Sequence, residues 1–238
     1  MPLASFFYSF FLEEHVPRSF DPQTLPQVAI ANAVSMDLSR LSVSFLRERF
    51  QLDLDWLAES TGEALLNPNE GFKPASVLLP IVVREDGLQV LLTQRAAHLH
   101  HHPGQISFPG GRVDADDLSA EHTALREAQE EIGLLASQIE ILGCLPHYFT
   151  GTGFAVTPVV ALVHLPLNLQ AQVAEVASIF EVPLQFLMDA ENHQIRQLQR
   201  QLPTGLETRS FYAMPYQEYF IWGATAGILR NLFHFLRA

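Results

Sequence analysis

The chain has little cysteine and little positive charge. Cys144 is the only cysteine, so an intramolecular disulfide is impossible and a CxxC metal site is absent, as expected for the reducing cytoplasm. The segment around Cys144 predicts a buried strand, with Cys144 as a core residue rather than a nucleophile. The formal net charge is −12, from 26 acidic and 14 basic residues. Because proteins that bind nucleic-acid phosphates usually carry the opposite balance, we predict no nucleic-acid partner.

Long apolar runs are also absent. No run approaches the ~18 apolar residues of a transmembrane helix, so we predict no membrane association. The aromatic-rich start, "MPLASFFYSFFLEEHV", has no basic region before its apolar part, which argues against a signal peptide. We therefore expect a cytoplasmic protein that acts as a monomer or homodimer on a small molecule. Apolar residues make up 48% of the chain, enough for a sizeable core.

The pattern of apolar residues divides the chain into two parts. Residues 1–35 predict an N-terminal extension, and residues 36–238 a single domain with a helical lead-in at 36–70 and a core at 75–238. Strands and helices in mixed order predict an α/β sandwich in which helices cover a mixed sheet, preceded by a helical extension. Strands are predicted at 75–83, 87–95, 138–146, 155–164, about 193–199 and 209–221, and helices within 36–63, 118–132, 179–189 and 222–237.

The helix predicted at 118–132 carries an unusual acidic face. Asp117 or Ser119 is the expected N-cap, and Gly133 follows the last turn. Apolar positions fall on one side of this helix, and Glu127, Glu130 and Glu131 on the other. Like charges three and four residues apart repel, so this face is either solvated or holds a divalent cation.

The loop before this helix favours the second interpretation. Gly110 and Gly111 in "SFPGGRVD" allow a tight turn or a close approach of the backbone to a ligand. Mg²⁺ prefers oxygen ligands, keeps several waters and is usually completed by substrate phosphates. The acidic face and the double glycine together predict a site for a metal-bridged diphosphate.

The segment "GGRVDADDLSAEHTALREAQEEIGL" resembles the Nudix box, Gly-x5-Glu-x7-Arg-Glu-U-x-Glu-Glu-x-Gly-U, where U is aliphatic. Two departures occur: Asp117 stands where the family has Glu, and the distance from Gly111 to Arg126 is one residue longer. Ala128 also replaces a larger aliphatic residue. The second half of the box matches at Arg126, Glu127, Glu130, Glu131, Gly133 and Leu134.

The preceding segment, "LLTQRAAHLHHHPGQISFPGG", resembles the signature of the coenzyme A diphosphatase subgroup of Nudix hydrolases. His100 replaces an Arg of that signature. The resemblance implies hydrolysis of the coenzyme A diphosphate to 4′-phosphopantetheine and adenosine 3′,5′-bisphosphate, with Mg²⁺ or Mn²⁺. It spans roughly residues 36 to 238 and matches at Leu91, Leu92, Thr93, Arg95, Ala96, Gly104, Phe108, Pro109, Gly110 and Gly111.

The same resemblance implies roles for individual residues. Glu127, Glu130 and Glu131 share metal ligation and the role of general base, with Glu131 as a direct ligand. Arg126 orients the acids through a pair with Glu130, and Glu175 is a further acid for the metal. The substrate is bound by Arg95, His100, Gly110 and Gly111.

Several alternatives remain open at this point. The four histidines of "HLHHHP", at 98 to 102, favour a polar loop over a zinc site. The aromatic residues between 211 and 222 either stack on adenine or pack in the core. The substrate is coenzyme A or its thioesters, or alternatively ADP-ribose, a dinucleotide or another nucleoside diphosphate derivative. A non-catalytic sensor with this fold is a further alternative.

Overall fold

A long antiparallel hairpin lies at the centre of the fold. The computed structural model describes residues 21–31, 36–59, 71–99, 101–202 and 205–238. Strand β2 (Lys73–Arg84) is followed by β3 (Gly87–Arg95), and a turn at residues 85–86 joins them, as predicted. Leu78 and Leu79 point to opposite faces of β2 and both are fully buried. The near-continuous apolar run of β2 therefore belongs to a strand that is covered on both faces.

The remaining strands extend this hairpin into a mixed sheet. Strand β8 (Phe154–Val163) lies parallel to β2, whereas the other pairings in the sheet are antiparallel. The main path of the sheet is β4-β3-β2-β8-β6. Its other strands are β4 (Ile106–Ser107), β5 (Gly110–Arg112) on β2, β6 (Ile139–Cys144), β7 (Tyr148–Phe149) on β8, and β9 (Val176–Pro183) on β3.

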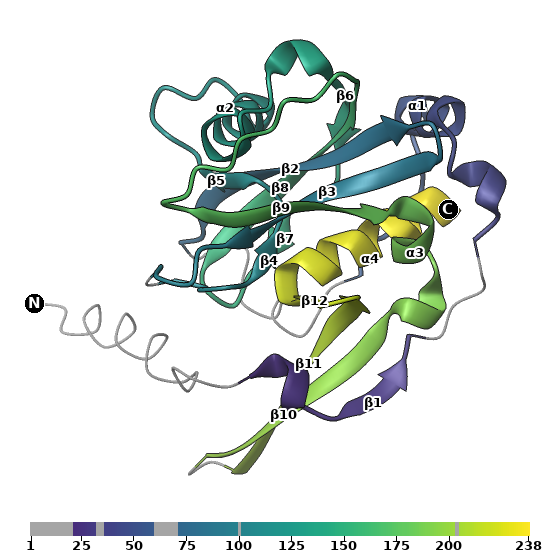
Figure 1. Ribbon diagram of the computed structural model, residues 1–238. Helices are drawn as coiled ribbons and strands as arrows, with labels where there is room; N and C mark the ends of the chain where they lie inside the picture. The colour runs from purple at the N-terminus through teal and green to yellow at the C-terminus, as the bar shows by residue number, and fades with distance from the viewer. Residues whose placement is uncertain (1–20, 32–35, 60–70, 100, 203–204) are drawn as a thin grey trace, which may run out of the picture.

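Helices cover both faces of this sheet, which confirms the predicted mixed α/β layers. Helix α2 (Ala120–Ile132) packs on one face through Ala124, Ala128 and Ile132. Helix α4 (Gly223–Arg237) lies across the opposite face, and Figure 1 shows the sheet between the two helices. Each face of the sheet thus has its own apolar core cluster.

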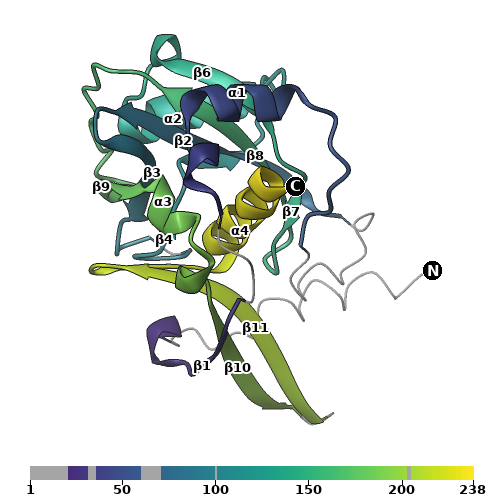
Figure 2. The same cartoon turned by 90° about the vertical axis from the view of Figure 1, so that its right-hand side faces the viewer.

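A second sheet explains why α4 is apolar almost all round. Its strands, in the order β1-β10-β11-β12, lie on the side of α4 that faces away from the first sheet (Figures 1 and 2). A helix between two sheets has no wide solvent-exposed face, so even Arg230 and Asn231 of α4 are buried. The strands are β1 (Gln27–Ile30), β10 (Gln194–Leu202), β11 (Gly205–Tyr216) and β12 (Tyr219–Trp222).

The prediction of a helical N-terminal extension is wrong for its described part. Residues 21–31 contain a 3-10 turn at Pro22–Thr24 and strand β1, which pairs with β10. Backbone pairing with a distant strand decides this conformation, which local periodicity cannot reveal. The rest of the extension lies outside the described residues.

In its described part, residues 36–59, the helical lead-in predicted for residues 36–70 is shorter than expected, and residues 60–70 lie outside the described residues. A 3-10 turn at Leu38–Arg40 precedes a single helix, α1 (Val43–Gln51), and residues 52–59 are not helical. This segment runs along α4 instead, where Glu59 accepts hydrogen bonds from Arg230 Nε (3.0 Å), His234 Nε2 (2.8 Å) and the Tyr212 hydroxyl. These bonds, that of His234 first, lower the pKa of Glu59 to about 2. Tertiary hydrogen bonds therefore override helix propensity here.

Two predictions in the C-terminal half need correction. The short helix predicted within residues 179–189 is restricted to α3 (Leu184–Leu187), because residues 179–183 belong to β9 and pair with β3. The strand predicted at 209–221 is two strands, β11 and β12, joined by a turn in which Gln217 has a φ of 51°. A short 3-10 turn at Ala190–Asn192 leads into β10, and another at Ala136–Gln138 leads into β6.

The expectation that Cys144 is a core residue is wrong. It does end a strand, but its side chain is exposed and its thiol donates to Glu121 Oε1 at 3.4 Å. Strand β6 is the last strand on the path of the sheet, so its end is not covered as the central strands are. No helix among the described residues is long and apolar enough to cross a bilayer.

Candidate active site

Helix α2 holds the acidic residues in a fixed position against the sheet. Ser119 is its N-cap, with its hydroxyl accepting from the His122 N–H at 3.2 Å. Gly133 ends the helix in the left-handed conformation, with φ 69°. Both helix boundaries agree with the predicted ones, so the three predicted acidic residues all lie in the last two turns of one rigid helix.

Glu131 is the buried member of the acidic group. The residue is only 5% exposed, and its Oε2 accepts a hydrogen bond from the Gly110 N–H at 3.2 Å. Burial raises the pKa of Glu131 to about 7, and the negative charges of Glu127 and Glu175 act in the same direction. The Gly110 N–H and the positive charge of Arg95 oppose this shift. The negative charge of the Glu131 carboxylate is therefore poorly balanced by the groups around it, so a cation bound there would stabilise it.

Glu127 lies directly against the double glycine. Its side chain is 16% exposed, and a Cβ atom built on Gly111 would lie 2.3 Å from its Oε1 atom. Burial raises the pKa of Glu127, although the charge of Arg126 partly compensates. Gly111 is therefore needed for the close approach of β5 to the acidic helix, whereas the predicted approach of this glycine pair to a ligand stays a prediction.

Arg126 connects the acids with one another. Its Nη1 atom donates to Glu127 Oε1 at 3.0 Å and to Glu130 Oε2 at 3.1 Å, so the predicted pair with Glu130 is present. Its Nε and Nη2 atoms donate to both oxygens of Asp117, at 3.1 and 2.9 Å. The Nη2 atom also donates to the Arg112 carbonyl at 3.2 Å. With all these donors engaged inside the protein, Arg126 acts as a positioning residue.

Asp117 is the anchor of this network, a role that the sequence left open. Its side chain is 2% exposed, and Oδ2 also accepts from the Thr123 hydroxyl at 2.8 Å and the Asp114 N–H at 2.9 Å. The hydrogen bonds from Arg126 first, and then from Asp114, hold the pKa of Asp117 well below its ordinary value. The Glu position of the Nudix box was the signal that could have identified this partner of Arg126.

Three other residues predicted for the site, Glu130, Glu175 and His100, differ in where they lie. Glu130 is mostly exposed, with 60% of its side chain accessible. Glu175 is also exposed, but it is close enough to raise the pKa of both Glu127 and Glu131. Its carbonyl accepts from the Ala96 N–H at 2.8 Å, which places it beside the end of β3. His100 lies outside the described residues, so its predicted role has no structural counterpart here.

Arg95, at the end of β3, carries an unpartnered donor. Its Nε atom is buried and has no hydrogen-bond partner among the described residues. Buried N–H groups rarely lack a partner, and a ligand oxygen would satisfy this one. The positive charge of Arg95 acts to lower the pKa of Glu131, so the Arg95 guanidinium lies within electrostatic range of the acidic group.

The carboxylates do not form a completed metal cage. No group of three His, Cys, Asp or Glu side chains within the described part of the chain is arranged to hold a metal ion. One oxygen of each glutamate instead accepts a hydrogen bond from within the protein: Glu127 Oε1 and Glu130 Oε2 from Arg126, and Glu131 Oε2 from the Gly110 N–H. The donor set nevertheless fits Mg²⁺ or Mn²⁺, because one or two carboxylates, water and substrate phosphates suffice for such an ion. The raised pKa values of Glu127 and Glu131 show that additional positive charge is favourable there.

The two glycines are expected to fail differently when replaced by alanine. In Gly111→Ala the new Cβ meets the end of the Glu127 side chain, which can move, so activity should fall roughly tenfold or more with little loss of stability. In Gly110→Ala it meets backbone atoms of β2, 2.4 Å from Ser76 O and 2.6 Å from Val77 Cα. Crowding of this kind costs about 1–3 kcal/mol, so the unfolding temperature should fall. Steady-state kinetics and thermal unfolding of both variants test this; wild-type activity in Gly111→Ala would contradict it.

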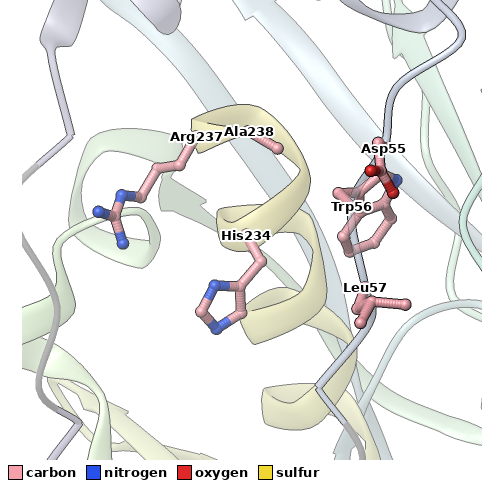
Figure 3. Close-up of a pocket in the computed structure, with 6 residues that line it drawn as sticks. All are labelled: Asp55, Trp56, Leu57, His234, Arg237 and Ala238. Carbon is pink, nitrogen blue, oxygen red and sulfur yellow. The ribbon is translucent and has the colours of Figure 1, made fainter.

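A surface hollow of about 320 Å³ lies elsewhere, between the end of α4 and the segment after α1. Figure 3 shows Trp56 and Leu57 alongside the last turns of α4, which carry His234 and Arg237. None of the predicted site residues lines it.

The aromatic residues between 211 and 222 contact other rings; Tyr219 stacks on Phe180 at 3.5 Å and Phe211 meets Trp222 edge-on.

This combination of a mixed α/β sandwich, a capped acidic helix and a double glycine against its glutamates is that of a diphosphate hydrolase. The NUDIX domain family matches residues 73–199, and the chain belongs to this family. It is a Nudix hydrolase, an enzyme that hydrolyses phosphoanhydride bonds.

Similar proteins are found in enterobacteria. The chain is 41% identical over 198 residues to the uncharacterized Nudix hydrolase NudL of Enterobacter sp. (strain 638), covering 83% of this chain and 96% of that protein. It is 42% identical over 202 residues to NudL of Salmonella newport (strain SL254), with the same two coverages.

Two of the similar solved structures each match about half of the chain. A Nudix hydrolase from M. smegmatis, RenU, is 28% identical and covers 48% of this chain and 72% of its own, with a TM-score of 0.42. A C. elegans Ap4A hydrolase in a binary complex is 23% identical and covers 47% of this chain and 80% of its own, with a TM-score of 0.41.

Proposed function

We propose that this Nudix hydrolase splits the diphosphate of coenzyme A or its thioesters, giving 4′-phosphopantetheine and adenosine 3′,5′-bisphosphate. The unit that carries the reaction is residues 36–238, which include the matched NUDIX segment at 73–199. The observation that carries the proposal is the segment from Leu91 to Gly111, which resembles the coenzyme A diphosphatase signature. Within this segment, at the end of β3, the buried Arg95 Nε atom has no hydrogen-bond partner among the described residues, and the charge of Arg95 acts on Glu131.

The acidic group would hold the cation. Glu131, Glu127 and Glu130 offer hard oxygen ligands from one helix, and Glu175 offers a fourth from the loop before β9. Bound there, Mg²⁺ or Mn²⁺ supplies charge neutralisation on the diphosphate oxygens and lowers the pKa of bound water. Glu131 is our preferred direct ligand, because its carboxylate is the most buried of the three.

The chain's own residues position the reactants. The Gly110 N–H fixes Glu131, and Arg126 fixes Glu127 and Glu130, so the carboxylates need little reorganisation during the reaction. Arg95 donates to a phosphate oxygen with its free Nε–H. One of the carboxylates accepts a proton from the attacking water while the bridging P–O bond breaks and the bridging oxygen leaves with the other phosphate.

Other nucleoside diphosphate derivatives are the alternative substrates. ADP-ribose and dinucleotides present the same diphosphate to the same acids, so the acidic group alone does not distinguish them. Coenzyme A differs in two features that surround the diphosphate, a 3′-phosphate on the ribose and a pantetheine arm.

A substrate panel with product identification tests the proposal. The purified protein is incubated with MgCl₂ or MnCl₂ and coenzyme A, acetyl-coenzyme A, ADP-ribose or a dinucleotide, and kcat/KM is measured for each. We expect the highest value for coenzyme A or its thioester, with 4′-phosphopantetheine identified by mass, and loss of turnover in excess EDTA. A higher kcat/KM for ADP-ribose or the dinucleotide would reject coenzyme A as the substrate, and turnover that survives EDTA would reject the metal.

A further inference from the structure

Positive charge is scarce in this chain, and most of the described arginine side chains are already bound to acidic groups, carbonyls or aromatic rings. The protein carries a net charge of −12 and has a single lysine, Lys73. Most arginine side chains are bound within the fold; Arg47 pairs with Glu140, for example, and Arg84 with Glu181.

Two neighbouring cations are exceptions. The Lys73 amine and the Arg112 guanidinium are both exposed, and neither forms an ion pair or a side-chain hydrogen bond with any described residue. Two solvated cations side by side repel each other weakly in water, and an anion bound between them would replace this repulsion with two attractions.

The strand register places these two side chains on one face of the sheet. Arg112 of β5 lies opposite Ala75 of β2, and Lys73 is two residues before Ala75 on the same strand. Residues two apart on a strand share a face, so Lys73 and Arg112 are diagonal neighbours. The side chain of Ala75 belongs to the core cluster on the α4 side of the sheet. Lys73 and Arg112 therefore lie on the same side of the sheet, outside this core cluster.

Phe154 supports the pair. It lies opposite Lys73 on the parallel strand β8, and the Arg112 guanidinium carbon is 5.2 Å from the centre of its ring. A guanidinium over an aromatic face is held with its plane defined and its N–H groups directed outward. The site therefore combines a fixed fork of donors with a mobile ammonium, a combination suited to a phosphate group.

The pair also adjoins the acidic group. Arg112 directly follows Gly111, which lies against Glu127, and the Arg112 carbonyl accepts from Arg126. Successive side chains of a strand alternate, so β5 has the acids of α2 on one side and the two cations on the other. In Figure 1, β5 lies beside α2, and its one partner among the described strands is β2.

We infer that Lys73 and Arg112 bind a phosphomonoester group that the substrate carries in addition to its diphosphate, on the ribose next to it. This inference rests on the proposed function and narrows it, because coenzyme A carries such a 3′-phosphate and ADP-ribose does not. A 3′- and a 5′-phosphate on one ribose are close together, and Arg112 directly follows Gly111, the residue of β5 that lies against Glu127. Lys73 and Arg112 thereby favour a substrate whose adenosine carries both a 3′- and a 5′-phosphate, as coenzyme A does.

The kinetic test compares coenzyme A with 3′-dephospho-coenzyme A, which differs only in the missing phosphomonoester. For the wild type we expect a higher kcat/KM on coenzyme A. In Lys73→Gln and Arg112→Gln this preference should fall, each by roughly tenfold, because a charged hydrogen bond to phosphate is lost. Arg209→Gln is the matched control: it removes the same charge from an exposed arginine on the β11 strand of the second sheet and should keep the preference.

A binding measurement that needs no turnover provides a second test. Because Lys73 is the only lysine, an amine-acylating reagent modifies this side chain and the N-terminal amine alone, and the modified peptides are separated by mass. Adenosine 3′,5′-bisphosphate should protect Lys73 from acylation several-fold better than adenosine 5′-monophosphate at equal concentration. In Arg112→Gln this difference should shrink.

The outcomes separate the two proposals. If the wild type hydrolyses neither coenzyme A compound, the proposed function fails, whatever the acylation shows. If it hydrolyses both, the subsite is rejected by equal wild-type rates on the two compounds, or by variants that lose activity equally on both. Equal protection of Lys73 by the mono- and bisphosphate would likewise overturn it. Unfolding temperatures of the variants near that of the wild type exclude misfolding as the cause, since both side chains are exposed.

Discussion

Replacement of Glu131 by Gln should lower kcat by two to four orders of magnitude while the fold remains intact, because the carboxylate charge is lost from the centre of the acidic group. Glutamine has nearly the same shape and can still accept the Gly110 N–H, so the helix and the glycine loop should keep their positions. The measurement is kcat on coenzyme A with saturating Mg²⁺, together with the unfolding temperature. Glu121→Gln, in the first turn of the same helix, is the matched control and should retain near wild-type turnover.

The same substitution should stabilise the metal-free protein at alkaline pH. Burial raises the pKa of Glu131 from 4.5 to about 7, so the folded state binds a proton that the unfolded state has lost between these values. The stability of the wild type should therefore fall as the pH rises from 4.5 to 7, and the deficit persists above pH 7. In EDTA at pH 8, Glu131→Gln should unfold at a higher temperature than the wild type.

For the catalytic prediction, near-normal turnover of Glu131→Gln would overturn the assignment of Glu131 as a ligand.

Replacement of Asp117 by Asn should lower kcat/KM roughly tenfold to a hundredfold, although Asp117 does not contact the reacting atoms in this arrangement. Arg126 would lose its two-pronged anchor, and Glu127 and Glu130, which accept from the same guanidinium, would lose their fixed positions. A higher Mg²⁺ concentration should be needed for half-maximal rate. The measurement is a MgCl₂ titration of kcat/KM, with Asp116→Asn, an exposed neighbour of the same chemistry, as the control.

The unusual spacing of the box gives a sharper form of this prediction. Compared with the Nudix pattern, the chain has a shorter acid at Asp117 and one more residue between this acid and Arg126. We expect Asp117→Glu alone to impair activity, because the longer side chain crowds a buried ion pair that already has its full set of bonds. Deletion of Leu118, which is 90% exposed, from that variant restores the family spacing and should recover part of the loss. Equal activity of Asp117→Asn and the wild type would contradict the anchoring role.

Elements with strong local signals were predicted closely. The hairpin of β2 and β3 has two β-rich runs and a short polar connection, and α2 has a Ser cap, an apolar stripe and a terminal Gly. In both cases the determining interactions lie within a few residues of each other in sequence. Helical spacing likewise placed Glu127, Glu130 and Glu131 in the last turns of α2, but the prediction that all three lie opposite the apolar side is wrong for Glu131, which is buried with Ala128 and Ile132.

Elements that depend on distant partners were missed. Strand β1 exists because β10 pairs with it. Residues 179–183 belong to a strand because they pair with β3. The second sheet could not be recognised as separate, because strand patterns do not state which strands pair. The burial of Glu131 and the exposure of Cys144 likewise depend on which segments cover them: Gly110 lies over the first, whereas the second ends the last strand on the path of the sheet.

The order of residues alone determined the family of this protein, the acidic helix and the glycine pair, because these depend on side-chain type and short spacing. Only the tertiary structure decided which acid is buried, that Asp117 anchors Arg126, and that Lys73 and Arg112 share one face of the sheet. The physical reason is that burial, ion pairing and strand register are set by segments far apart in the chain. Solvent exclusion and charge at the site therefore emerge only when these segments are packed together.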